Sequence, residues 1–282
     1  MIAGAAARLA EGTLPHLPSS LEVPVAMLGG TVAYRASAGA RRAVRENLSI
    51  VAPTIGERDR QRLVRQTFVE QVRHYVEIFR LARFDHETVR RAVMTTGWER
   101  FAAAAARGGG VILASGHIGP VSVCGQIIAA NGYDVTLPIE NETGELARAV
   151  NRARTRMGLR FVGTDSALGI ARVLKRGGIL GVLADRAITG VGERVPFFGR
   201  PALLPSAHVA LALRTGAALI PAFAHREGNI LRAVFEPELE LLRTGDRDAD
   251  VREGMRRWAA VLERHVRVAP EQWSVFEPVW RR

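Results

Sequence analysis

The chain has 282 residues, 48% of them apolar and 24% charged, a balance that is typical of folded proteins and excludes wholesale disorder. This length suits one large α/β domain or two small ones and is enough to bury a full core. Lys and Arg number 39 against 28 Asp and Glu, for a net charge of +11. Lys175 is the only lysine, so arginine carries almost all of the positive charge.

A basic surface of this kind suits two classes of partner, nucleic acid and an anionic membrane. Arginine binds phosphate as a planar fork with a permanent charge. The arginines are spread through helical stretches, aromatic residues make up 6%, and no nucleic-acid-binding module is recognisable. The composition therefore favours an anionic membrane lipid as the partner, and we expect no nucleic acid.

The chain contains one cysteine, Cys124, which excludes an internal disulfide and a cysteine-rich metal site and suits a reducing compartment. Residues 1–22 lack the basic cluster and apolar core of a signal peptide. The charge-free apolar run at 23–34 is far shorter than the ~20 residues that cross a bilayer. We expect a peripheral protein on the cytoplasmic face of the cell membrane, attached through residues 14–28 and the arginines of 41–45.

The first hundred residues are predicted to be helical, with helices at 41–48 and 57–81. Within the second helix, Leu63, Phe68, Val72, Tyr75, Val76 and Phe79 recur at helical spacing, which is typical of a face that packs on a core.

From residue 108 the pattern changes to alternating strands and helices. The sequence predicts strands at 111–115, 133–139, 161–162, 179–183 and 218–224, and helices at 121–130, 145–157, 167–175 and 209–214, with a glycine-bearing loop at 196–201. This alternation indicates an α/β fold with a central, mostly parallel (mixed) sheet flanked by helices. We expect a single domain over 1–282, helical to residue 100 and α/β from 101.

His117 occupies the most informative position. It lies on a glycine-rich turn between a buried strand and an apolar helix, and Pro120 suits the first turn of that helix. Ligands of parallel sheets bind at the carboxyl ends of strands, and both His117 and Asp185 follow a strand. A histidine there can act as a general base at neutral pH, or it can be a structurally bonded loop residue.

Two other kinds of site are excluded by order and spacing. The glycines at 108–110 precede the strand, whereas the glycines of a dinucleotide fingerprint follow it. His117, His208 and His225 are not at metal-ligand spacing, so no metal site is predicted. His208 is interpreted as a helix-face residue, and Cys124 as a small core residue.

An ordered set of motifs runs over most of the chain, at residues 41–48, 110–119, 183–186, 192–199, 210–217, Pro221, 269–273 and 278–280. On these motifs the chain resembles the bacterial lysophospholipid-acyltransferase-like superfamily, which includes the lipid A late acyltransferases and the mycobacterial phosphatidylinositol mannoside acyltransferase. The end of the chain is more similar to the mannoside enzyme.

The resemblance implies a glycerolipid-acyltransferase-like fold and an active site with a His-x4-Asp/Glu motif, in which the acid orients the imidazole and stabilises its protonated form. His117 matches the histidine, but Ser122 stands at the acid position. Three alternatives then remain open: the His117 base is weaker, another carboxylate has taken over the role of the acid, or the protein no longer catalyses the reaction. Asp185 and Glu140 match other family positions as candidate catalytic carboxylates. Arg154, Ser122 and Arg186 are the candidate substrate-binding residues, although Asp185 and Arg186 could also form a local ion pair.

The function that the resemblance implies is an O-acyltransferase. It would move a fatty-acyl chain from acyl-CoA or an acyl carrier protein to a hydroxyl of a membrane glycolipid, as a monomer and without a further cofactor. The alternative is a catalytically impaired lipid-binding protein on the same fold, because of Ser122. We expect Ser122→Asp to speed turnover, unless Asp185 or Glu140 already supplies the acid, and we expect Arg154 and Asp185 to share one cleft with His117.

Overall fold

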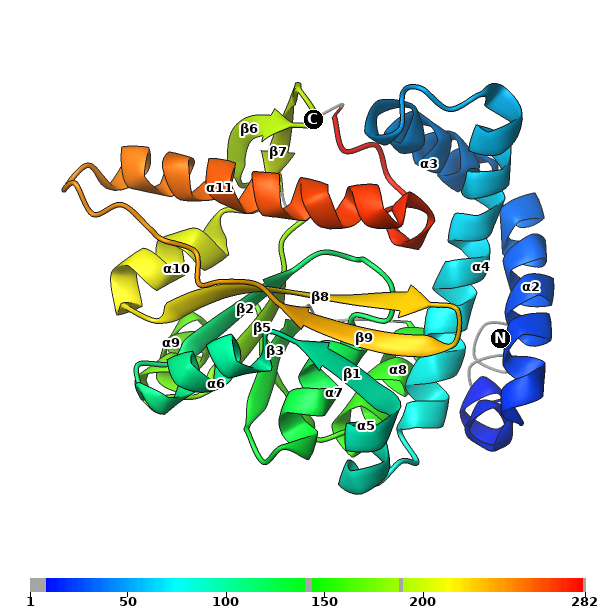
Figure 1. Ribbon diagram of the computed structural model, residues 1–282, viewed down its shortest axis with the longest axis horizontal. Coiled ribbons are helices and arrows are strands. Elements are labelled where there is room, and N and C mark those ends of the chain that lie inside the picture. The colour runs from blue at the N-terminus through cyan, green and yellow to red at the C-terminus, as the bar shows by residue number, and fades with distance from the viewer. Residues whose placement is uncertain (1–8, 140–143, 188–189, 281–282) are drawn as a thin grey trace.

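The computed structural model describes residues 9–139, 144–187 and 190–280, and within them a seven-stranded sheet forms the centre of the molecule (Figure 1). The strand order is β1-β9-β8-β2-β5-β3-β4. Strands β2, β3, β4, β5 and β8 are parallel, and β9 pairs antiparallel with β8 and parallel with β1. The predicted mostly parallel, mixed sheet is confirmed. Its strands are β1 (Val93–Thr96), β2 (Val111–Ser115), β3 (Val135–Ile139), β4 (Leu159–Gly163), β5 (Ile179–Leu183), β8 (Ala218–Glu227) and β9 (Ile230–Phe235).

Strand β2 is buried along its whole length, because it lies between β5 and β8 and is covered on both faces. Val111 and Leu113 point into one core, and Ile112 and Ala114 point into the other. A strand that is covered on both faces has no need of polar side chains, which is why this segment is a continuous apolar run.

Helices cover both faces of the sheet. In Figure 1, α11 lies above the sheet with α10, and α5, α6, α7 and α8 lie below it. A long helix, α4, runs beside the sheet on the right of Figure 1, and α2 lies beyond it. The helical segments are η1 (Leu14–His16), α2 (Ser19–Ala36), α3 (Ala38–Val51), α4 (Glu57–Leu81), α5 (His86–Ala92), α6 (Trp98–Ala106), α7 (Ser122–Ala130), α8 (Glu145–Arg156), α9 (Ala167–Lys175), α10 (Ala207–Thr215), α11 (Arg247–Val268) and η2 (Pro270–Gln272).

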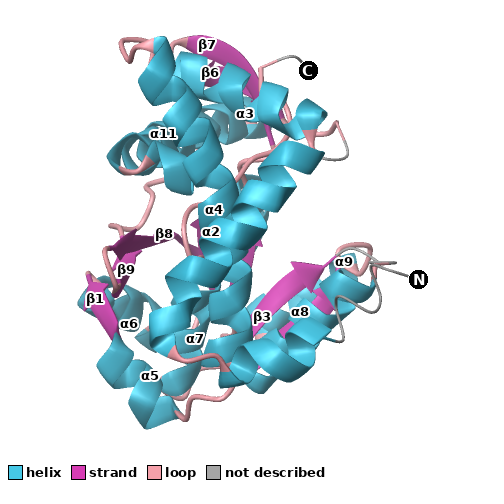
Figure 2. Cartoon of the chain, turned by 90° about the vertical axis from the view of Figure 1, so that its right-hand side faces the viewer, coloured by secondary structure: helices cyan, strands magenta, loops and turns pink. Residues whose placement is uncertain are grey.

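The N-terminal helices form a layer against α4, and Figure 2 views the molecule from this side. The apolar stripe of α4 is confirmed as core packing, since Phe68, Val76 and Phe79 are all buried. Buried Glu22 on α2 accepts hydrogen bonds from Arg73 and Arg80 on α4. This partly buried ion-pair cluster joins the outer helix to α4.

Two parts of the prediction were wrong. The segment expected as a loop at 196–201 belongs to an antiparallel hairpin of β6 (Glu193–Phe197) and β7 (Arg200–Leu204), whose turn contains Phe198 and Gly199 at positive φ. The first hundred residues are not wholly helical, because β1 joins the edge of the sheet. Its short length and exposed positions left little periodicity to detect. None of the described helices combines the length and apolar character that crossing a membrane requires.

Candidate active site

His117 and Asp185 are brought together by the sheet. Strands β2 and β5 pair in parallel with Ser115 beside Leu183, so the chain leaves both strands at the same edge. His117 Nδ1 lies 2.7 Å from Asp185 Oδ1, and the backbone N–H of His117 donates to Asp185 Oδ2 at 2.7 Å. Asp185 is fully buried, whereas 26% of the His117 side chain is exposed. One buried carboxylate therefore holds both the ring and the backbone of the histidine.

Two glycines in the turn allow this approach. A Cβ at Gly116 would lie 3.0 Å from Asp185 Oδ2, so a side chain there would crowd the carboxylate. Gly119 has φ +51, and its Cβ would lie 2.6 Å from the carbonyl oxygen of Ala224. Both the positive φ and the close contact favour glycine at this position.

Asp185 is ionised at neutral pH. Burial alone would raise its pKa, but the charge of His117, hydrogen bonds from His117 and a hydrogen bond from Trp273 together lower the pKa below its usual range. The carboxylate accepts the Nδ1 proton of the imidazole, which leaves Nε2 as the ring nitrogen that can take up a proton.

Ser122 does not contact the imidazole in the way that its place in the His-x4-Asp/Glu motif would imply. Its hydroxyl accepts a hydrogen bond from Arg154 Nε at 3.2 Å instead. Ser122 is the first residue of α7, beyond the turn that carries His117. The sequence left three outcomes open, and the carboxylate that lies beside the His117 imidazole in the described part of the chain is that of Asp185.

A buried histidine, His74 on α4, is coupled electrostatically to these residues. Burial lowers its pKa well below the usual value, and the charges of Arg154, Arg226 and His117 lower it further. Arg154 and His117 therefore both lie close enough to act on the same imidazole. The Nδ1 of His74 is buried with no hydrogen-bond partner among the residues that the structure describes. Sequence reasoning assigned His74 no role, because it stood within an ordinary amphipathic helix.

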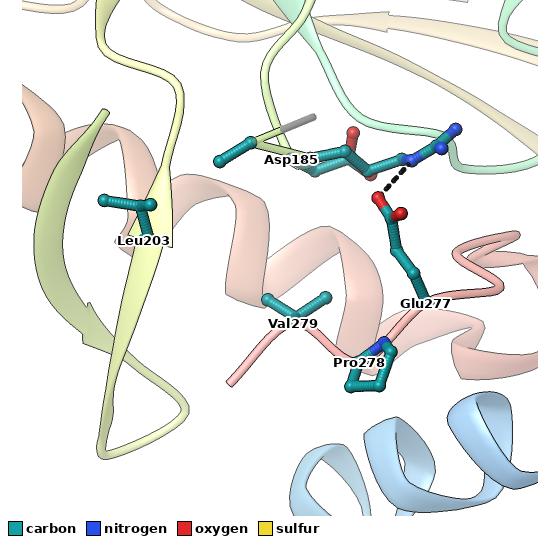
Figure 3. Close-up of a pocket in the computed structure, with 7 residues that line it drawn as sticks. Asp185, Leu203, Glu277, Pro278 and Val279 are labelled. Carbon is teal, nitrogen blue, oxygen red and sulfur yellow. Dashed lines mark hydrogen bonds and ion pairs between the residues drawn. The ribbon is translucent and has the colours of Figure 1, made fainter. Parts of the chain in front are cut away.

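Arg186 forms an ion pair with a residue that is distant in the chain. Its Nε donates to Glu277 of the C-terminal segment at 2.8 Å, so the local ion pair considered between Asp185 and Arg186 is replaced by a long-range one (Figure 3). A small pocket lies here, and Figure 3 shows the residues that line it. They are Asp185, Arg186, Ala187, Leu203, Glu277, Pro278 and Val279. The remaining candidate, Glu140, lies outside the described residues.

Three more histidines, His208, His225 and His265, and the single cysteine are buried in the protein. His208 is buried edge-on against Trp258, and burial lowers its pKa to about 3. His225 and His265 are hydrogen-bonded and stacked in the core. Cys124 is buried, and burial raises its pKa to about 12. The interpretation of His208 and Cys124 as packing residues is confirmed. Within the described ranges, no group of three or more His, Cys, Asp or Glu residues could hold a metal ion.

Comparison with known proteins shows which family the chain matches. Residues 10–282 match the family described as bacterial lipid A biosynthesis acyltransferase. The chain is 26% identical over 216 residues to the phosphatidylinositol mannoside acyltransferase of Mycobacterium tuberculosis, covering 74% of this chain and 67% of the relative. It is 26% identical over 260 residues to the enzyme of the same name from Mycolicibacterium smegmatis, covering 90% and 84%. This chain therefore belongs to the bacterial lipid A biosynthesis acyltransferase family and is an acyltransferase that acts on glycolipids.

Proposed function

We propose that the enzyme transfers a fatty-acyl chain from the thioester of coenzyme A or an acyl carrier protein to a hydroxyl of a phosphate-bearing membrane glycolipid. A phosphatidylinositol mannoside or a lipid A-like molecule is the acceptor class that the family and the relatives' names favour. The observation that carries the proposal is the contact between His117 Nδ1 and the buried carboxylate of Asp185.

The proposed reaction needs no covalent enzyme intermediate, because a thioester is already an activated acyl donor. His117 Nε2 takes the proton of the acceptor hydroxyl as its oxygen attacks the thioester carbonyl carbon. Asp185 stabilises the imidazolium that forms. When the tetrahedral intermediate collapses, the C–S bond breaks, and the sulfur leaves with the proton that His117 carried. The products are the ester and the free thiol.

Arg154 is the residue that we propose for binding an anionic group of a substrate. It lies beside Ser122, the residue at the acid position of the His-x4-Asp/Glu motif, and a guanidinium suits the phosphate of either the acceptor or the donor. Its contact with Ser122 would hold the side chain in place. The lipid-binding alternative rested on the missing acid at Ser122, and the contact between Asp185 and His117 favours catalysis over that alternative.

The activity is tested with the purified full-length chain, labelled acyl-CoA and acyl carrier protein in separate reactions, and a phosphatidylinositol mannoside or lipid A precursor. Mass spectrometry identifies the product. We expect His117→Ala to reduce turnover by roughly 10²–10⁴-fold, the usual contribution of a general base. His86→Ala, at an exposed histidine, is the matched control and should leave turnover unchanged. Equal turnover in His117→Ala and wild type would overturn the mechanism. No transfer by the wild type from either donor would overturn the proposed function.

We also propose that α2 attaches the enzyme to the cytoplasmic face of the membrane. Its outer surface exposes Leu21, Val23, Met27, Leu28 and Val32, and Leu28 alone is 70% exposed. Exposed Arg35 and Arg42 make no ion pair within the described part of the chain, so both can meet anionic headgroups, at ~1 kcal/mol each.

Two of the arginines expected to bind lipid have partners within the protein. The guanidinium of Arg41 donates to the carbonyl oxygens of Tyr34 and Arg35 at the end of α2, and Arg45 pairs with Glu57 at 2.9 Å.

Flotation with liposomes tests the attachment. We expect Leu28→Asp to reduce binding to anionic vesicles at low salt. Leu242→Asp is the control, since Leu242 is 42% exposed and belongs to the segment between β9 and α11, away from α2 in the chain. Equal binding of the wild type and Leu28→Asp to anionic vesicles would rule out α2 as the attachment site.

A further inference from the structure

Residues 269–279 cross the catalytic turn as a strap after the end of α11. The backbone N–H of Gly119 donates to the carbonyl oxygen of Gln272 at 2.9 Å, and the N–H of Ser274 donates to the carbonyl oxygen of His117 at 2.8 Å. An antiparallel bridge pairs Ile118 with Trp273 between these two bonds. The strap therefore fixes the backbone of the turn that carries the base, although it lies about 155 residues away in the chain.

Trp273 contacts the acid as well. Its indole Nε1–H donates to Asp185 Oδ2 at 2.9 Å, and this oxygen also accepts the backbone N–H of His117. With Oδ2 held by two donors, the carboxylate presents Oδ1 to the imidazole, and rotation of the carboxylate would break both bonds. The indole itself is buried, with Phe197 and Trp280 edge-on to it at centroid distances of 6.0 and 6.1 Å.

The far end of the strap is anchored to the N-terminal helices by one buried side chain, Asn47 on α3. Its Nδ2 donates to the carbonyl oxygens of Val275 at 3.2 Å and Glu277 at 2.9 Å, and its Oδ1 accepts the N–H of Val279 at 3.2 Å. These bonds limit the freedom of the chain just after Trp273, so the indole is held at both its ring and its backbone.

We propose that Trp273 is a positioning residue of this enzyme: its indole N–H fixes the orientation and electrostatics of the Asp185 carboxylate that serves the His117 base. The proposal rests on the proposed function of the His117–Asp185 pair. Trp273 contacts the base only through Asp185 and the backbone, so its effect should appear in the chemical step and in the pH dependence, and not in substrate affinity.

The direction of the pH effect follows from the hydrogen bond. A donor on Oδ2 withdraws electron density from the carboxylate, so its loss leaves more negative charge to stabilise the protonated imidazole. The charged and titratable groups in this part of the described chain include His74 on α4, Arg154 on α8 and the Arg186–Glu277 ion pair, whereas the side-chain hydrogen bond of Trp273 is to Asp185. We expect the acidic limb of the pH–rate profile to move to higher pH.

The first experiment compares Trp273→Phe with Trp280→Phe in the full-length enzyme. Trp280 donates its indole N–H to the carbonyl oxygen of Phe197 and makes no bond to Asp185, so it is the matched control. We expect Trp273→Phe to lower kcat by about tenfold with KM unchanged, as for one lost hydrogen bond to a charged group. We expect Trp280→Phe to leave the pH–rate profile in place. An unchanged kcat and an unchanged profile in Trp273→Phe would overturn the proposal.

A double-mutant cycle tests whether Trp273 acts through Asp185. In an Asp185→Asn background, the further change Trp273→Phe should cost much less than tenfold, because the carboxylate that it positions is gone. Full additivity of the two losses would mean that Trp273 acts by another route.

Two further measurements test the role of Trp273 if Trp273→Phe does not fold or if the wild type is inactive. If Trp273→Phe does not fold, site-specific replacement by benzothienylalanine keeps the bicyclic shape and removes the N–H. If the wild type transfers no acyl group, the proposed function fails. NMR titration of the His117 ring then still tests Trp273, with a midpoint that moves to higher pH expected and an unmoved midpoint overturning the proposal.

Discussion

At the scale of single residues, the site is defined by which carboxylate reaches the imidazole. Residues five apart at the start of a helix leave in different directions, and Ser122 accordingly contacts Arg154 and not His117. Asp185 reaches His117 from a neighbouring strand, 68 residues further along the chain. The carboxylate partner is thus a product of strand pairing.

Asp185→Asn should therefore lower turnover to nearly the level of His117→Ala. An amide is similar in shape but carries no charge to stabilise the imidazolium, and it can present its NH2 group to the ring and favour the wrong tautomer. Steady-state kinetics with circular dichroism as the check on folding measures this. Activity within a few-fold of wild type would remove Asp185 from the mechanism.

Ser122→Asp should not speed turnover, contrary to the expectation for a chain that lacked an acid beside the base. The new carboxylate would pair with Arg154, which already donates to the Ser122 hydroxyl, and would partly neutralise the proposed anion-binding guanidinium. We expect a higher KM for the anionic substrate with little change in kcat. Ser122→Ala is the control that removes the hydroxyl without adding charge. A rise in kcat for Ser122→Asp would show that residue 122 can serve the base directly.

At the scale of elements, α2 packs closely on α4. A Cβ at Gly30 would lie 2.6 Å from the Cα of Val69, so the two helices approach almost to backbone contact there. Glu22, Arg73 and Arg80 add ion pairs along the same interface. The result is an outer helix held firmly by one side while its apolar outer surface stays exposed.

Gly30→Ala should lower the free energy of unfolding by ~1–3 kcal/mol, because the added methyl group forces the helices apart. Gly39→Ala on α3 is the matched control. No neighbouring atom lies within 4 Å of its Cβ, so the change should be neutral or stabilise the protein by up to ~1 kcal/mol. Urea denaturation of both variants measures the difference. Equal stability of Gly30→Ala and Gly39→Ala would contradict the close contact.

At the scale of the whole molecule, buried histidines tie stability to pH. Burial lowers the pKa of His208 to about 3 and that of His225 to about 4, and it also lowers the pKa values of His74 and His265. Above about pH 6.5 these residues are neutral in both the folded and unfolded states. Below it the unfolded chain binds protons that the folded protein excludes, so stability falls as the pH falls from about 6.5 toward 4.

At pH 5 each histidine that stays neutral in the fold should cost ~2 kcal/mol of stability relative to pH 7. Urea midpoints measured at both pH values test this. His208→Gln should weaken the pH dependence of stability, whatever it does to stability at pH 7. It removes one histidine that burial keeps unprotonated in the folded protein. His86→Gln, at an exposed position, is the control and should leave the dependence unchanged. A wild-type midpoint that does not fall at pH 5 would contradict the prediction.

The local sequence pattern was enough to predict those helices and strands whose apolar pattern is uninterrupted. The buried strands at 111–115 and 179–183 and the helices at 57–81 and 167–175 were predicted with the bounds that the structure has, because burial on both faces or on one helix face leaves a clear apolar pattern. The hairpin of β6 and β7 was missed because prolines and glycines interrupt it, and its stability comes from contact with α11.

The sequence by itself determined the α/β fold class, the position of His117 at the end of a buried strand, and the family resemblance that pointed to Asp185 and Arg154. Only the tertiary structure decided which groups lie beside the histidine. Strand pairing brings Asp185 to Nδ1, and the strap brings Trp273 to the other carboxylate oxygen. The packing of α4 places His74 close enough to His117 and Arg154 for their charges to act on it. The physical reason is that apolar periodicity is local and is written in neighbouring residues. A hydrogen bond between side chains 68 or 88 residues apart depends on strand register and helix packing, which no short stretch of sequence contains.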